Sequence, residues 1–371
     1  MRRFGARHLV ALGAVTLVGC LLTRVETPLP GDAPHFSVAL ATGDLDEDGL
    51  SDLVVAHDPE GPRTKDAPTA TALRSEGDGS FEAVPTPITY AQVRRLLLRD
   101  FDGDGVLDLA ALRRDADGLG PVLIYLGQND GTFSPPVDLI GLVTPGGLAA
   151  GDITGDGILD LVISDGDTRT LRLAVGQGDG TFVEETLISG LSAFDLAIAD
   201  LDGDGHEDVA LVREDLTILL NDGSGTVRIA GSYAAGERPR ALAIADLDLD
   251  GQQDIAVVDS EHDTLHVFFS PGHDSTRSER YEVGPGPEAL AVGHVNGDPW
   301  PDVVVANTGG ASVSVLLGRG GGQLIRRPLT LDVGDGPAAV ALPDLTGDGR
   351  PEIVTVNRRA GTVTALLGPV R

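Results

Sequence analysis

An acidic nine-residue loop recurs seven times along this chain and is the strongest chemical signal in its sequence. The full form has Asp at positions one, three, five and nine and Gly at position six. Four copies are complete: Asp44, Asp46, Asp48 and Asp52; Asp100, Asp102, Asp104 and Asp108; Asp200, Asp202, Asp204 and Asp208; and Asp246, Asp248, Asp250 and Asp254. Two copies have Thr at position three: Asp152, Thr154, Asp156 and Asp160, and Asp344, Thr346, Asp348 and Glu352. The remaining copy is degenerate: His294 and Pro299 replace the first Asp and the Gly, and Asn296, Asp298 and Asp302 remain.

This arrangement of carboxylates favours a hard divalent cation. Unit charges about 4 Å apart repel by roughly 4 kcal/mol at an effective dielectric constant near 20, so adjacent carboxylates need a neutralising partner. Calcium accepts about 6–8 oxygen ligands from carboxylates, carbonyls and water, and Gly at position six permits the sharp turn between them. We therefore predict calcium at about six loops. Thr keeps an oxygen but removes a charge, which weakens two of these sites, and His294 and Pro299 argue against a seventh.

Two other structures share parts of this pattern. An EF-hand loop begins in the same way, but it needs a bidentate Glu at position twelve and a helix on each side. Position twelve is apolar here, as at Val55, Ala111, Ile163, Leu211 and Val257, and the flanks resemble strands. Asp-Gly pairs also occur in plain hairpin turns, but four complete copies in phase favour calcium over a polar turn.

The spacing of the loops predicts the elements that position them. The loop starts lie 56, 52, 48, 46, 48 and 50 residues apart, a period typical of propellers and other repeat arrays. Short apolar runs flank the loops, as at 241–245 and 255–258, and predict buried strands. A third apolar strand, a turn containing Asp-Gly and a more polar fourth strand follow. Four antiparallel strands per repeat of about 50 residues predict a propeller blade.

On these loops and strands the chain resembles the FG-GAP/VCBS repeat family, whose best-known members include the N-terminal propellers of integrin α chains. The resemblance implies an all-β fold, a seven-bladed β-propeller of four-stranded antiparallel blades over residues 20–371. It also implies that each acidic loop joins the first and second strands of a blade and binds calcium. At residues 294–302, where the motif is incomplete, the resemblance still implies a blade but argues against a bound metal.

The two ends of the repeat series predict how the ring closes. The seventh repeat stops after its third strand, near Leu367, and lacks a fourth. The stretch 23–29 precedes the first loop as 279–283 precedes the sixth. We expect this N-terminal stretch to supply the missing outer strand, which would close the ring and remove a free sheet edge.

The N-terminus has the features of an export signal. Arg2, Arg3 and Arg7 precede an apolar run at 9–18 that is too short to span a membrane. The run ends at Cys20, the single cysteine, in a context that resembles a bacterial lipobox. We predict that residues 1–19 are a lipoprotein signal peptide and that Cys20 carries the lipid. The alternative is an ordinary signal segment that happens to contain a cysteine.

Composition narrows the function. A formal net charge of −30 excludes a nucleic-acid binder, because the phosphate backbone demands Lys and Arg. The sequence has no Gly-x-Ser-x-Gly or His-Glu-x-x-His motif and no cysteine besides Cys20, so we predict no enzyme. Two classes remain. The first is an interaction or adhesion scaffold, anchored to the bacterial envelope (the outer membrane in a Gram-negative cell), with a protein or glycan partner. The second is a carbohydrate-binding or polysaccharide-acting propeller, which the 4% aromatic content disfavours.

Overall fold

The structure is a computed structural model of the chain. It describes residues 11–17, 20–29, 39–57, 69–86, 88, 92–114, 120–142, 144–272, 277–368 and 370. Within these ranges the elements are all strands, joined by turns and loops. The described residues therefore contain no helix with the length and apolar character needed to cross a membrane.

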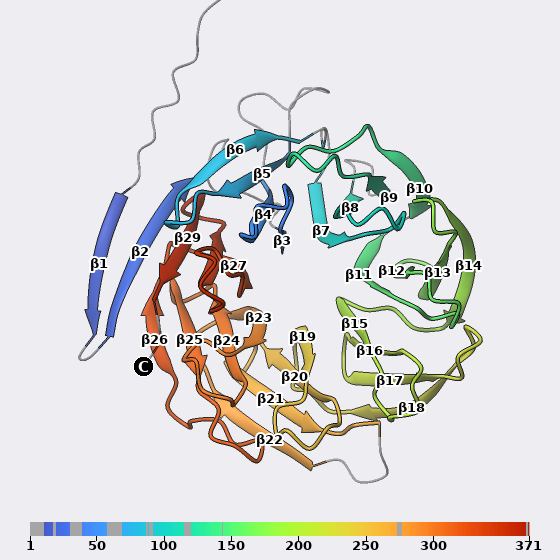
Figure 1. Ribbon diagram of the computed structural model, residues 1–371. Helices are drawn as coiled ribbons and strands as arrows, with labels where there is room; N and C mark the ends of the chain where they lie inside the picture. Colours follow the sequence, from blue (N-terminus) through green and yellow to red (C-terminus); the bar gives the residue numbers. More distant parts are fainter. Residues whose placement is uncertain are drawn as a thin grey trace, which may run out of the picture.

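Seven antiparallel sheets are arranged around a central channel as the blades of a propeller (Figure 1). The first strand of each blade lines the channel and the fourth forms the outer rim. This confirms the predicted fold class. The acidic loops begin directly after the first strands, so the repeat seen in the sequence and the blade coincide.

The strands of the first three blades follow the chain in order. Blade one is β3 (Leu40–Gly43), β4 (Asp52–Ala56), β5 (Ala70–Ser75) and β6 (Phe81–Pro85). Blade two is β7 (Gln92–Arg99), β8 (Asp108–Arg114), β9 (Gly120–Tyr125) and β10 (Val137–Leu142). Blade three is β11 (Pro145–Gly151), β12 (Asp160–Asp165), β13 (Thr170–Gly176) and β14 (Phe182–Ser189).

The next three blades repeat this order. Blade four is β15 (Asp195–Ala199), β16 (Asp208–Val212), β17 (Leu216–Asn221) and β18 (Val227–Tyr233). Blade five is β19 (Pro239–Ala245), β20 (Asp254–Asp259), β21 (Thr264–Phe269) and β22 (Arg277–Glu282). Blade six is β23 (Pro287–Gly293), β24 (Asp302–Asn307), β25 (Ser312–Leu316) and β26 (Leu329–Asp332).

Blade seven combines both ends of the chain. Its first three strands are β27 (Pro337–Ala341), β28 (Ile353–Asn357) and β29 (Thr362–Leu367). Its fourth is β2 (Cys20–Pro28), which pairs antiparallel with β29 from Thr23 opposite Leu367 to Pro28 opposite Thr362. The predicted closure by the N-terminal stretch is therefore confirmed. A fifth strand, β1 (Ala11–Leu17), pairs with the outer edge of β2.

β1 lies within the predicted signal peptide, of which residues 1–10 and 18–19 lie outside the described residues. The other six blades have four strands each. Blade seven also has four if β1 is set aside, so its closure does not require the chain before Cys20.

The hydrophobic core consists of seven clusters, one at each junction between neighbouring blades. The second strands are apolar on both faces because each lies between two such junctions. In β4, for example, Leu53 and Val55 pack toward blade seven, and Val54 and Ala56 pack toward blade two. This explains why these strands lack the alternation of polar and apolar residues that a half-exposed sheet shows.

The strand order places all seven acidic loops on one face of the ring, which we call the loop face. First strands run toward this face and second strands run away from it. The turns between third and fourth strands lie on the same face. The opposite face carries the turns between second and third strands and the connections between blades.

Candidate metal centres

Carboxylates within each acidic loop fold the loop by accepting its own backbone N–H groups. In blade two, Asp100 Oδ1 accepts from Gly103 (2.7 Å) and Oδ2 from Gly105 (2.9 Å). Asp104 Oδ1 accepts from Val106 at position seven (2.8 Å). The bond from position six to position one recurs in all six loops that have Asp at position one. The local sequence therefore curls each loop around its first carboxylate.

Backbone conformation explains the glycine at position six. Gly49, Gly105 and Gly205 have φ of 87°, 90° and 89°, in the left-handed region that favours glycine. A Cβ at these positions would meet nothing within 4 Å, so the requirement concerns φ and not space.

Position four is also left-handed, which the sequence reasoning missed. Glu47 and Leu249 have φ of 58° and 61° there, a conformation that costs a non-glycine residue roughly 1 kcal/mol or more. The signal was present in the sequence, because Gly occupies the same position at residues 103, 155, 203, 297 and 347.

The carboxylate at position nine joins the loop to the third strand of its blade. Asp208 is fully buried, and its Oδ2 accepts from Leu201 of the loop (2.9 Å) while Oδ1 accepts from Asn221 at the end of β17 (2.8 Å). The same pair of bonds occurs at Asp52, Asp108, Asp160 and Asp254. We call this arrangement the position-nine clip.

Burial also changes the acidity of the clip. Desolvation raises the pKa of the position-nine carboxyls in the four complete loops to about 6. Backbone hydrogen bonds to these carboxyls act in the opposite direction. The four residues are Asp52, Asp108, Asp208 and Asp254. Neighbouring carboxylates in each loop add to the rise. A cation in the loop would oppose both causes, because it favours the ionised form.

The four complete loops bring three carboxylates together. In blades one and five the oxygens come from positions one, three and five: Asp44, Asp46 and Asp48, and Asp246, Asp248 and Asp250. In blades two and four they come from positions one, three and nine: Asp100, Asp102 and Asp108, and Asp200, Asp202 and Asp208. Within each group the ligand atoms lie within 4.8 Å of one another, close enough for one cation to contact all three.

Position three provides oxygen atoms without partners. Asp46 Oδ2 lies 3.3 Å from Arg74, whereas its Oδ1 is buried with no hydrogen bond. The hydroxyl of Thr154, at the same position in blade three, is also buried without a well-formed hydrogen bond. Buried polar atoms in native proteins are nearly always satisfied, so these oxygens fit ligands of an ion. Calcium at positions one, three, five and nine would neutralise the loop and crosslink its two strands.

The degenerate loop of blade six keeps the clip and loses the ligand arrangement. Asp302 is buried and accepts from Gly318 at 2.8 Å and from Asn296 at 3.3 Å. The Asn296 amide donates to Asp298 at 2.6 Å, so these two side chains satisfy each other. The backbone carbonyl of His294 accepts from Gly297 at 3.2 Å, in place of the missing carboxylate. The blade therefore folds here without a ligand set for calcium.

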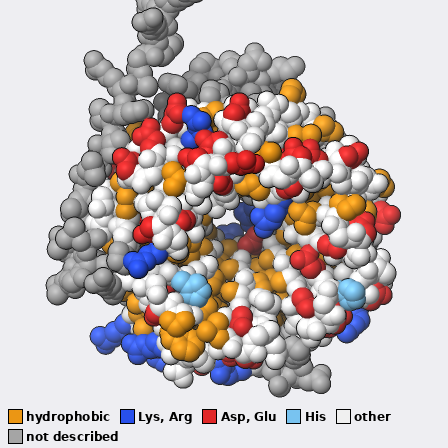
Figure 2. Space-filling model, in the orientation of Figure 1, with side chains coloured by type: hydrophobic (Ala, Val, Ile, Leu, Met, Phe, Trp, Pro, Cys, Tyr) orange, Lys and Arg blue, Asp and Glu red, His pale blue; other side chains and the backbone are white. Residues whose placement is uncertain are grey.

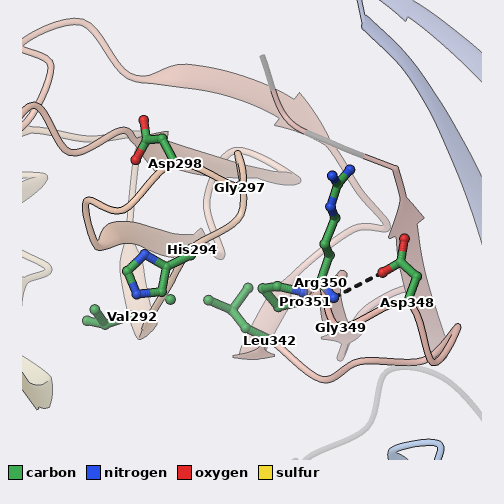
Figure 3. A pocket seen from close by; sticks show the side chains of 10 residues that line it. Val292, His294, Gly297, Asp298, Leu342, Asp348, Gly349, Arg350 and Pro351 are labelled. Atoms are coloured by element: carbon green, nitrogen blue, oxygen red, sulfur yellow. Dashed lines mark hydrogen bonds between the residues drawn. The ribbon is translucent and has the colours of Figure 1, made fainter.

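A hollow of about 510 Å³ separates this degenerate loop from the loop of blade seven (Figure 3). His294 and Asp298 line one side, and Arg350, at position seven of the next loop, lines the other. The Arg350 N–H donates to Asp348 at 3.0 Å. On the loop face, this hollow brings the Arg350 guanidinium to the same space as the carboxylates of Asp298 and Asp348.

The loops also connect neighbouring blades. The carbonyl of Leu45 accepts from Gly131 of blade two at 3.2 Å, and that of Phe101 accepts from Gly180 of blade three at 3.3 Å. The Ile153 carbonyl accepts from the Asn221 amide of blade four at 2.8 Å. The backbone carbonyl at position two thus accepts a hydrogen bond from the end of the third strand, or from the turn after it, in the next blade. An ion that orders one loop would therefore also support the junction between the two blades.

A second cavity, of about 180 Å³, lies at the mouth of the channel on the opposite face. Arg95 of β7 and Asp195 of β15 form an ion pair at 3.2 Å across it. These residues occupy the same position in blades two and four, and Gly147 occupies it in blade three, where a Cβ would meet the Leu196 side chain at 3.0 Å. Asp195 also accepts from the Leu242 backbone of blade five at 3.1 Å. Burial raises the pKa of Asp195 despite the nearby guanidinium.

Comparison with known families supports this description of the repeats. The FG-GAP-like repeat matches residues 44–111, 100–163, 152–211, 200–257 and 294–355, together well over half of the chain. Each matched range begins at position one of an acidic loop. Human integrin alpha-IIb is 28% identical over 185 residues, which are 41% of this chain and 17% of that protein. The chain thus matches about a sixth of that relative's length.

Solved structures share the fold at low sequence identity. BBS1N, solved in complex with ARL6DN, aligns with a TM-score of 0.63 and 13% identity over 93% of this chain and 96% of that one. A periplasmic gluconolactonase of Pseudomonas aeruginosa aligns with a TM-score of 0.59 and 16% identity over 89% and 97% of the two chains. A protein from Lactobacillus plantarum aligns with a TM-score of 0.62 and 13% identity over 82% and 88%.

Proposed function

We propose a function for this chain, which belongs to the FG-GAP-like repeat family. In this proposal it is an exported, lipid-anchored, calcium-binding scaffold of the bacterial cell envelope. In this proposal the propeller binds a protein or another envelope component through its loops and catalyses no reaction. The integrin-like repeats support an interaction scaffold, since propellers use a rigid ring to present loops.

The observation that carries calcium binding is the set of carboxylate clusters, one in each complete loop, with an unpartnered buried oxygen at Asp46. Calcium prefers oxygen ligands in such numbers and at such spacing. Calorimetric titration of the chelator-treated protein tests this proposal. We expect about six ions per chain, and no heat of binding would refute it.

Export and anchoring rest on the N-terminal segment and Cys20. The structure is compatible with removal of residues 1–19, because β2 completes blade seven without β1. Expression in a bacterium followed by intact mass measurement tests the anchor. A lipid mass on Cys20, lost in Cys20→Ala, is the expected result; an unmodified chain that retains residues 1–19 would refute it.

The partner can be sought with the calcium-loaded ring. We expect an envelope protein or glycan to be retained by the immobilised propeller in calcium and released by chelator. The matched control is the variant Asp100→Asn, Asp200→Asn, which weakens two loops and leaves the remaining surface intact. Equal capture of the partner with and without calcium would show that partner binding does not depend on the acidic loops.

A second candidate is carbohydrate binding at the channel mouth. The observation that favours it is the cavity lined by Arg95, Asp195 and Glu288, whose charged groups suit hydroxyl and carboxylate groups of sugars. Phe194, which precedes Asp195 in the chain and whose ring lies under Arg213, is 45% exposed. The gluconolactonase named above shares the propeller fold. Binding to a glycan array that is lost in Arg95→Ala, or lactone hydrolysis, would favour this candidate over the scaffold.

A further inference from the structure

Five exposed arginines gather at the outer rim of blades five and six, on a chain with 27 basic and 57 acidic residues. We call them the arginine patch: Arg277, Arg280, Arg319, Arg326 and Arg327. Figure 2 shows acidic side chains around most of the ring and Lys and Arg side chains gathered at the lower left rim, where β22, β25 and β26 lie in Figure 1. The patch is therefore a local exception to the charge of the protein.

Most of this positive charge is available to a partner. Arg277 stacks on the Phe269 ring at 3.8 Å and lies 4.0 Å from Asp248. Arg326 lies 3.8 Å from Glu279. Arg319 and Arg327 make no ion pair with any residue that the structure describes.

Arg280 and Arg326, from different blades, line one hollow of about 320 Å³ together with Tyr281 and Glu282. Two guanidinium groups at a shared hollow provide the donors that phosphate and carboxylate groups accept.

The patch lies on the same side of the ring as Cys20. β2 runs antiparallel to β29, which ends at the loop face, so β2 begins at the loop face with Cys20. Arg319, Arg326 and Arg327 belong to the connection between β25 and β26, on the same face of the adjacent blade. Leu22 of β2 packs in one apolar cluster with Leu331 of β26, and Figure 1 shows the start of β2 next to β26.

We propose that the arginine patch is a membrane-contact surface that binds anionic phospholipid headgroups. The inference rests on the proposed lipid anchor, which would hold this sector of the ring at the membrane. Arginine side chains near an anionic surface gain electrostatic free energy that the acidic remainder of the ring lacks. The patch thus determines which part of the ring faces the membrane, and it leaves the channel and most loops open to a partner.

An acidic polysaccharide is the other ligand of matching charge. The phospholipid surface is favoured because the patch and Cys20 occupy adjacent blades of one face. A soluble polysaccharide would have no reason to bind next to the anchor.

Vesicle sedimentation of the chain from residue 20 onward, carrying Cys20→Ala, tests the patch without the anchor and without the basic, apolar segment before Cys20. Vesicles of phosphatidylcholine alone are compared with vesicles that also contain phosphatidylglycerol, at fixed calcium and increasing salt. We expect salt-sensitive binding to the anionic vesicles only. Arg319→Glu, Arg326→Glu, Arg327→Glu should weaken it by about tenfold or more, whereas the Lys versions at the same positions should retain it.

The matched control reverses three exposed arginines elsewhere: Arg169→Glu, Arg228→Glu and Arg238→Glu. It has the same net charge and should bind nearly as well as the parent chain. Equal loss of vesicle binding in both triple variants, or equal binding of the parent chain to both vesicle types, would overturn the proposal. It would also be overturned if the Arg319, Arg326 and Arg327 variant lost binding to a soluble acidic polysaccharide and kept binding to vesicles. Melting curves check that both variants fold. Intact mass of the native chain reports the anchor separately, so failure of the anchor and failure of the patch are distinguishable.

Discussion

The loops of blades two and six differ in their ligands and agree in their clip. Asp108 in blade two and Asp302 in blade six are both buried, and each accepts a backbone N–H from the third-strand end of its own blade at 2.8 Å. Blade two also brings Asp100 and Asp102 to Asp108. In blade six, His294 contributes no carboxylate and Asn296 bonds to Asp298. The comparison teaches that both kinds of blade keep the clip, while only the complete loops gather the charges at positions one, three and five that a cation would neutralise.

Removal of metal should give the largest effect. A site at a hundred times its dissociation constant stabilises by about 2.7 kcal/mol, and about six sites add up. We expect chelator to lower the melting temperature strongly and excess calcium to restore it. An unchanged melting curve would contradict the metal interpretation of blade two and make its loop equivalent to that of blade six.

Loss of a clip should be the next largest effect and should be equal in the two kinds of loop. Asp208→Ala leaves two buried backbone N–H groups without acceptors, and Asp302→Ala leaves two partly buried ones, at a cost of up to about 3 kcal/mol. Denaturant unfolding in chelator measures both. The control is Asp332→Ala, which removes an exposed carboxylate on β26 of the same blade as Asp302. A much smaller loss for Asp302→Ala would show that blade six does not depend on the clip.

The pH dependence should reverse with metal. In the metal-free chain the pKa of Asp52, Asp108, Asp208 and Asp254 is about 6, above the ordinary 3.8. The folded state therefore holds protons that the unfolded state has released, and stability falls as pH rises from about 4 to about 6. Calcium competes with these protons, so with calcium stability should rise over the same range.

Melting temperatures across that pH range, with and without chelator, measure the reversal. Asp130→Asn is a control, because the Thr132 hydroxyl lowers the pKa of this exposed carboxyl. The same slope with and without calcium would remove the link between the clip and the ion.

Rebuilding the degenerate loop should give the smallest effect. His294→Asp, Asn296→Asp and Pro299→Gly restore the ligands and the glycine, and we expect one additional calcium in a titration. The stabilisation should stay below that of a natural site, because the Trp300 ring packs closely on Gly320 and restricts the loop. A Cβ added at Gly320 would lie within about 3 Å of this ring. His294→Ala, Asn296→Ala, Pro299→Gly is the control without ligands, and it should bind no additional ion.

Local pattern accounts for much of what was predicted. The number of blades follows from seven loops in phase, and β2 as the closing strand follows from a seventh repeat that lacks a fourth strand. The ligand residues were named from their spacing alone, because the nine residues of a loop must fold on themselves. Calcium, the lipid on Cys20 and the partner stay predictions.

Other features required the folded ring. Sequence could name Asp208 but not Asn221 as its second clip partner, and it gave no sign of the Arg74 side chain beside Asp46. The pair Arg95 and Asp195 joins residues of non-adjacent blades. Its geometry depends on the curvature of the ring, which brings blades two and four to one cavity at the channel mouth.

The sequence by itself determined the repeat and the loop chemistry, because these depend on residues near one another along the chain. It also indicated the strand that closes the ring, because the seventh repeat lacks a fourth strand and a strand-like stretch precedes the first repeat. Only the tertiary structure decided which oxygens lack partners, which carboxyls are buried enough to raise their pKa, and which arginines gather beside the start of β2. Those properties depend on groups far apart in sequence that meet when seven blades pack around one channel.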